Sequence, residues 1–134
     1  LFTLIGEFYS NDIKLKTINA KNLPEAVLNI FEGAHINVKW VGVDNPACDV
    51  EFLHKVIYVK RPVRGCLNVL PASAVIFGYA CNSDIMLLMD DEGIVYISLQ
   101  IIDKLFCGGE FFDALIRLFL GLDYGELLCT TSTE

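Results

Sequence analysis

The chain has 134 residues, of which 54% are hydrophobic, and its 17 acidic and 10 basic side chains give a formal net charge of -7. This composition excludes a disordered chain, and no apolar run approaches the roughly 18 to 20 residues that span a bilayer. An acidic surface repels phosphate, which argues against nucleic-acid binding. We therefore expect one soluble domain over residues 1–134, with a protein partner of basic character and no membrane or nucleic-acid contact.

The N-terminal part of the chain predicts two strands and a helix. Residues 1–8 are apolar and strand-like, and residues 12–18 alternate as in a strand with one wet face. A short helix is expected at about 23–32, because Asn22 can cap its start and Gly33 suits a left-handed stop.

Two further strands are expected before the middle of the chain. Residues 36–43 alternate with period two, which places Trp40 on the apolar side, and residues 52–60 are again strand-like. The connection at 61–71 contains two prolines and a glycine. Its basic cluster, Lys60–Arg64, is typical of a solvated loop.

The second half predicts an antiparallel meander followed by a helix. Three apolar runs, residues 74–79, 84–89 and 93–98, are separated by short polar links. The acidic link Asp90–Gly93 has the composition of a hairpin turn and lacks the alternating ligands of a calcium loop. An amphipathic helix is expected at about 109–120.

These elements predict an α+β fold. It is an antiparallel, strongly bent sheet of about six strands, with the short helix at 23–32 and the C-terminal helix at 109–120 packed on it. Residues 126–134 are expected to form a flexible tail. Because the chain starts at Leu1, we expect it to be trimmed from a longer protein.

The five cysteines are widely spaced, which excludes the C-x-x-C pairs of zinc and redox sites. They are Cys48, Cys66, Cys81, Cys107 and Cys129. Most lie among apolar neighbours, so we expect unpaired, buried thiols in a reducing compartment, cytoplasmic or nuclear.

No catalytic, metal-binding or cofactor-binding motif stands out. His35 and His54 are the only histidines, and a cysteine-histidine dyad formed in space stays open as an alternative. The pair Gly108-Gly109 has no dinucleotide or phosphate-binding pattern around it, and we expect it to precede the C-terminal helix. The sequence therefore predicts a non-enzymatic domain without cofactor.

Two parts of the chain resemble the SUKH superfamily of α+β domains. Residues 23–33 resemble its Leu-Pro helix ending in glycine; residues 75–78, 84–88 and 93–96 are similar to its run of strands, and residues 110–115 to its Phe-rich closing helix. The family includes bacterial toxin-immunity proteins, eukaryotic regulatory proteins and a host-modulating gene family of beta-herpesviruses and other DNA viruses. The resemblance implies a partner-binding domain without catalytic residues.

The favoured hypothesis is a viral or host-modulating module that binds and neutralises or redirects a partner protein. A bacterial immunity protein capping a basic nuclease toxin is the alternative, and a cysteine-dependent enzyme is the second alternative. The partner-binding surface is expected on exposed loops and at the lone tryptophan. Its predicted residues are Asp84, Asp90, Asp91, Glu92, Lys60, Arg61, Arg64 and Trp40.

Overall fold

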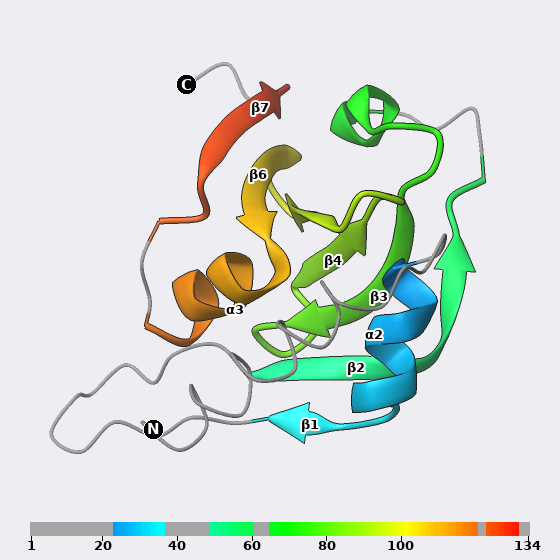
Figure 1. Cartoon of the computed structure of the whole chain (residues 1–134). Coiled ribbons are helices and arrows are strands. Elements are labelled where there is room, and N and C mark those ends of the chain that lie inside the picture. Colours follow the sequence, from blue (N-terminus) through cyan, green and yellow to red (C-terminus); the bar gives the residue numbers. More distant parts are fainter. Residues whose placement is uncertain (1–22, 37–48, 61–64, 121–122, 132–134) are drawn as a thin grey trace, which may run out of the picture.

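Seven strands form one antiparallel sheet in the computed structural model, which describes residues 23–36, 49–60, 65–120 and 123–131. The strands lie side by side in chain order, and two α-helices accompany them (Figure 1). The strands are β1 (His35–Ile36), β2 (Val50–Tyr58), β3 (Val75–Ala80), β4 (Ile85–Met89), β5 (Ile94–Leu99), β6 (Lys104–Glu110) and β7 (Glu126–Thr130), and the helices are α2 (Leu23–Phe31), the 3-10 helix η1 (Gly65–Val69) and α3 (Phe111–Phe119).

This arrangement confirms the predicted α+β class and the antiparallel meander of β3, β4 and β5. The predicted helix at 23–32 is α2, and Gly33 has the expected positive φ of 68° just beyond its end. The predicted strands at 1–8 and 12–18 lie outside the described residues, as does most of the strand predicted at 36–43.

The C-terminal helix predicted at about 109–120 is α3, and the Gly108-Gly109 pair precedes it as expected, near the end of β6. A Cβ on Gly108 would lie 3.0 Å from the Ile97 side chain and 3.1 Å from that of Ala114, so glycine here lets α3 approach the sheet closely. Residues 126–130 are β7, paired with β6, instead of the start of a flexible tail.

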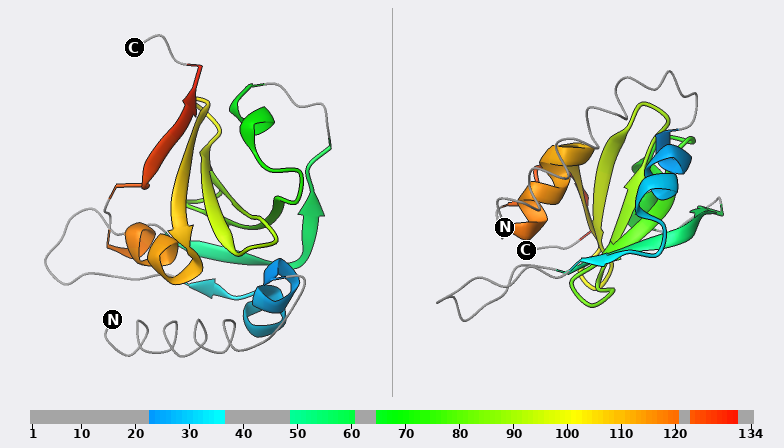
Figure 2. Two further views of the ribbon diagram at one scale, coloured as in Figure 1. Left: turned by 45° about the horizontal axis from the view of Figure 1, so that its top comes forward. Right: turned by 60° about the horizontal axis from the view of Figure 1, so that its bottom comes forward.

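The main hydrophobic core lies between the sheet and the two α-helices. α2 packs on β2 and β3, whereas α3 packs on β5 and β6. Both helices lie beside the bent sheet (Figure 2) and contribute to this one core, in which the Phe31 and Phe111 rings meet with centroids 5.6 Å apart. Alternate strand residues such as Phe77, Leu87 and Ile97 are fully buried in this core.

A second, smaller core covers the opposite face of the sheet. Here η1 and the segment after it bury Cys66 and Leu70 against Ile76, Leu88 and Leu105. The residues of β3, β4 and β5 are therefore apolar on both faces. This explains why these strands appear in the sequence as continuous apolar runs with little alternation.

Candidate partner-binding groove

The predicted acidic loops do not form one surface. Asp84 precedes β4 and Asp90–Glu92 follow it, so the two groups lie at opposite ends of a five-residue strand. A strand of that length spans about 15 Å. Asp84, Asp91 and Glu92 are exposed, and their role in partner binding stays a prediction.

Asp90 is a structural residue of the β4–β5 turn and is only 5% exposed. Its Oδ1 accepts hydrogen bonds from the N–H groups of Glu92 (2.9 Å) and Ile94 (3.0 Å). The Tyr96 hydroxyl donates to its Oδ2 at 3.1 Å. Burial, reinforced by this carboxylate, raises the pKa of Tyr96 to about 12. The turn predicted at Asp90–Gly93 is confirmed, whereas the prediction that Asp90 is an exposed contact was wrong.

Asp49 has a similar structural role at the other end of β4. Cys81, Asn82 and Ser83 form a turn in which all three non-glycine residues have positive φ. Asp49 accepts a hydrogen bond from the Asn82 N–H at 2.8 Å and lies 2.6 Å from the His35 ring. Burial raises the pKa of the Asp49 carboxyl, but these hydrogen bonds outweigh it, so the pKa is lower than usual.

Of the predicted basic contacts, the structure describes only Lys60. Lys60 is exposed just beyond β2. Arg61, Arg64 and Trp40 lie outside the described residues, and their predicted role in binding stays a prediction.

A large irregularity in β2 produces the candidate site. Phe52 pairs with Gly78 and Ile57 pairs with Ile76, so four residues of β2, from 53 to 56, face a single residue of β3. The extra residues make β2 turn sharply beside α2 (Figure 1). Such bulges bend a strand and redirect its side chains, and they occur often beside functional sites.

A groove with a volume of about 470 Å³ lies between α2 and this bent part of β2. Its lining combines carboxylates, an imidazole, an ammonium group and an exposed tyrosine with a short apolar floor. The lining residues are Glu25, Leu28, Asn29, Glu32, His54, Lys55, Val56 and Tyr58. None of these residues is among the partner contacts predicted from the sequence, because a bulge leaves no clear signal in an apolar strand.

His54 lines the groove, and its ring lies beside Gly33 at the end of α2. Its Nδ1 lies 3.5 Å from the Glu32 carboxylate. A Cβ on Gly33 would lie 2.6 Å from the ring, so glycine at the end of α2 makes room for the imidazole. Tyr58 is 70% exposed, with its ring available to a ligand. Carboxylates and an exposed aromatic ring that line one groove are suited to lysine or arginine side chains.

Three of the cysteines are oxidised, which corrects the expectation of unpaired thiols. Cys66 in η1 and Cys129 in β7 form a disulfide with their Cα atoms 5.5 Å apart, and Cys81 is also disulfide-bonded. Cys107 is the free cysteine within the described part of the chain. No local pattern predicts this pair, since its members are 63 residues apart and meet only when β7 joins the sheet.

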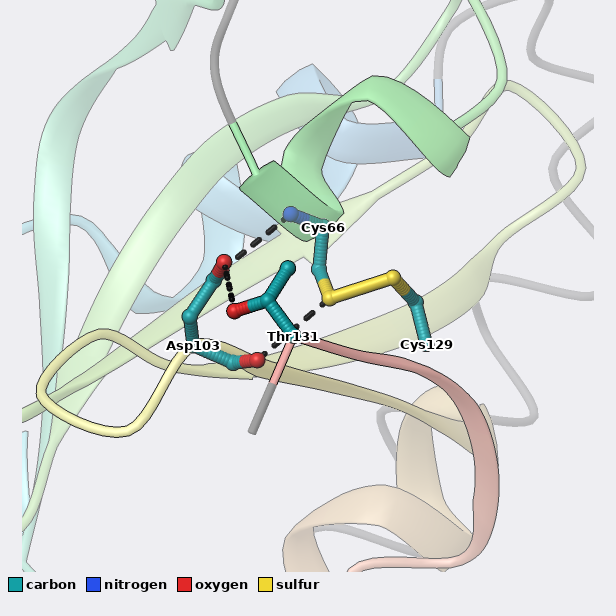
Figure 3. Close-up of a disulfide and its surroundings, with 4 residues drawn as sticks. All are labelled: Cys66, Asp103, Cys129 and Thr131. Atoms are coloured by element: carbon teal, nitrogen blue, oxygen red, sulfur yellow. Dashed lines mark hydrogen bonds between the residues drawn. A yellow bond between two sulfur atoms is a disulfide. The ribbon is translucent and has the colours of Figure 1, made fainter. Parts of the chain in front are cut away.

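Asp103 links the two sides of this disulfide (Figure 3). Its carboxylate accepts hydrogen bonds from the Cys66 N–H (3.1 Å) and from the Thr131 hydroxyl (2.7 Å). The Thr131 N–H donates to its carbonyl oxygen at 3.3 Å. η1 and the end of β7 are therefore attached to the β5–β6 turn as well as to each other.

Neither histidine contacts a cysteine among the described residues, since His35 lies against Asp49 and His54 against Glu32. Within the same residues, no group of three or more histidine, cysteine, aspartate or glutamate side chains is arranged to hold a metal ion. The described residues are strongly acidic, with thirteen acidic side chains against four basic ones. The acidic residues are Glu25, Glu32, Asp49, Glu51, Asp84, Asp90, Asp91, Glu92, Asp103, Glu110, Asp113, Asp123 and Glu126, and the basic ones are Lys55, Lys60, Lys104 and Arg117.

Comparisons of the chain with protein-family models, with curated proteins and with solved structures found no match. Across the described ranges, no helix combines the length and the hydrophobicity needed to cross a membrane. The resemblance to the SUKH superfamily therefore stays a prediction from the sequence.

Proposed function

We propose that this protein is a non-enzymatic interaction domain that binds a basic segment of a partner protein in the groove between α2 and β2. The observation that carries the proposal is the bulge of β2, which bends this strand beside α2. The groove between them is lined by Glu32 and Tyr58 among others. The net charge of -7 favours a basic partner, because complementary charge accelerates encounter.

The cysteine-dependent enzyme is the weaker alternative. A catalytic thiolate needs an activating base or cation beside it. Cys66, Cys81 and Cys129 are in disulfides, and His35 and His54 contact carboxylates. These contacts argue against a thiol-imidazole pair in the described part of the chain.

The disulfides bear on where the domain acts. Disulfides persist in oxidising compartments and are rare in the cytosol. We therefore favour an oxidising environment over the cytoplasm or nucleus expected from the sequence. On this basis the viral or host-modulating module stays first among the settings that the SUKH resemblance implies. An immunity protein capping a nuclease would act beside nucleic acid, in a reducing compartment.

Binding of basic peptides would test the proposal. We would titrate fluorescent lysine- and arginine-containing peptides into the oxidised chain and into Glu32→Gln and Tyr58→Ala variants. In the variant that carries both Glu32→Gln and Tyr58→Ala, the loss of one ion pair and one cation-π contact should weaken binding about tenfold, or by about 1.4 kcal/mol. Asp84→Asn is the matched control, because Asp84 is equally exposed but is not among the groove residues.

Raising the salt concentration should slow association, since exposed charges are screened. Two results would contradict the proposal: equal affinity of the wild type and the groove variant, or a loss of affinity in Asp84→Asn alone. The second result would return the binding surface to the acidic turn predicted from the sequence.

A further inference from the structure

His54 is the one imidazole among the described residues that line the groove between α2 and β2. Histidine is the residue type that commonly gains a proton between pH 8 and pH 5, whereas carboxylates and ammonium groups commonly keep their charge over this range. A mild change of pH therefore acts on the charge of this groove through the imidazole of His54.

The ring has a defined position beside two negative partners. Its Nδ1 lies 3.5 Å from the Glu32 carboxylate. A Cβ on Gly33 would lie 2.6 Å from the Cε1 atom of the ring, so the ring lies against the backbone just beyond the last residue of α2. The C-terminal end of a helix carries a partial negative charge, and α2 has no basic residue in its last turn. A proton on His54 would therefore place a positive charge between a carboxylate and the end of a helix.

One proton on the imidazole changes the net charge of the described groove lining from -1 to 0. The carboxylates of Glu25 and Glu32 contribute two negative charges, and the Lys55 ammonium group contributes one positive charge. Tyr58 also lines the groove, and tyrosine is neutral near pH 7. The β3 residues opposite the bulge, 76–78, carry no titratable side chain. A groove suited to cations therefore loses its net negative charge when the imidazole is protonated.

A protonated His54 would compete with a basic ligand for Glu32. The two side chains are already within the distance of an ion pair. They are 79% and 60% exposed, so a cation from solvent can reach the carboxylate while the ring is neutral. Once the ring is charged, a lysine or arginine side chain would meet an imidazolium that repels it and a carboxylate that is already paired.

We propose that His54 is a pH switch for this groove, which holds a basic segment of a partner near neutral pH and releases it in mild acid. The inference rests on the proposed function and adds its regulation. The proton and the basic segment are both cations that use the Glu32 carboxylate, so each weakens the binding of the other. Affinity for a basic segment should therefore fall as the pH decreases.

The test titrates a fluorescent peptide of lysine, arginine and glycine, with acetylated and amidated ends, into the oxidised chain at pH 7.5 and at pH 5.5. The peptide has the same charge at both pH values, and a constant ionic strength keeps the screening equal. Wild-type affinity should fall about fivefold at pH 5.5, as expected for the loss of one good exposed ion pair. By reciprocity, saturating peptide should make the His54 ring harder to protonate in an NMR titration.

Two substitutions at His54 separate the effect of the proton from that of the side chain. His54→Gln cannot gain a charge, so its affinity should match the wild type at pH 7.5 and should change less than about twofold at pH 5.5. His54→Lys carries a permanent charge, so it should bind about fivefold more weakly than the wild type at pH 7.5, with no further loss at pH 5.5.

His35→Gln is the matched control and should keep the wild-type fall in affinity. His35 is also exposed and beside a carboxylate, 2.6 Å from Asp49, but it is not among the groove residues. Circular dichroism at both pH values shows whether each variant is folded.

The results distinguish the failure of this inference from the failure of the proposed function. Equal wild-type affinity at the two pH values, with binding that still depends on Glu32 and Tyr58, would overturn the switch alone. A fall that persists in His54→Gln would also overturn it, because another group would then carry the proton. No binding of the peptide at pH 7.5 would overturn the proposed function, and the switch with it.

Discussion

Removing the Cys66–Cys129 disulfide should destabilise the fold strongly and should act first on β7. The bond closes a loop with a sequence separation of 63. The chain-entropy relation gives a stabilisation of about 4 kcal/mol for a loop of that length, because the cross-link restricts the unfolded chain. With a urea m-value of about 2 kcal/mol/M, the unfolding midpoint should fall by about 2 M.

The variant to measure is the double replacement Cys66→Ala with Cys129→Ala. A single replacement would leave a thiol able to pair with the free Cys107. Urea unfolding followed by circular dichroism gives the free energy, and hydrogen exchange shows whether residues 126–130 open before the rest of the sheet. Cys107→Ala is the matched control and should cost no more than about 1 kcal/mol, since it removes one partly buried sulfur.

A loss below about 1 kcal/mol in the double variant would refute the reasoning. It would mean either that the bond does not form or that the unfolded chain is no freer without it. Peptide mapping of the wild type without reductant separates these two cases, because it detects the Cys66–Cys129 cross-link directly.

Three further predictions concern the turns and the bulge. Because the pKa of Tyr96 is raised to about 12, the folded state holds the hydroxyl proton more tightly than the unfolded state does. The free energy of unfolding should therefore fall by about 3 kcal/mol between pH 10 and about 12. In urea titrations, Tyr96→Phe should abolish this fall. Asp49→Asn should remove the stability that the lowered carboxyl pKa provides above about pH 4, so its unfolding midpoint should depend less on pH under acid conditions than that of the wild type. Gly78→Ala should cost about 1 to 3 kcal/mol, because the new Cβ would lie 2.6 Å from the Glu51 carbonyl oxygen opposite the β2 bulge; thermal melts that match the wild type would contradict that geometry.

Local signals predicted most of the central fold. The three meander strands, the helix α2 and the turn at Asp90–Gly93 all follow from patterns within about ten residues. β6 and β7 did not follow, because a glycine pair interrupts the pattern of β6 and the short run Glu-Leu-Leu-Cys-Thr of β7 does not alternate. Pairing with β5 and the disulfide hold these two strands in the sheet.

The candidate surfaces were predicted less well than the fold. The sequence pointed to exposed charges, and one of these, Asp90, is buried by its hydrogen bonds to the turn and to Tyr96. The groove beside α2 depends on unequal numbers of residues in β2 and β3, which is a property of strand pairing.

By itself, the sequence determined the class of the fold and the acidic character of the surface, because hydrophobic periodicity, turn residues and charge are local properties of the chain. The tertiary structure alone decided which cysteines are joined, which acidic side chain is buried, and where strand pairing leaves a groove. These features arise from contacts between residues far apart in the chain, and such contacts form only when the strands are assembled in register.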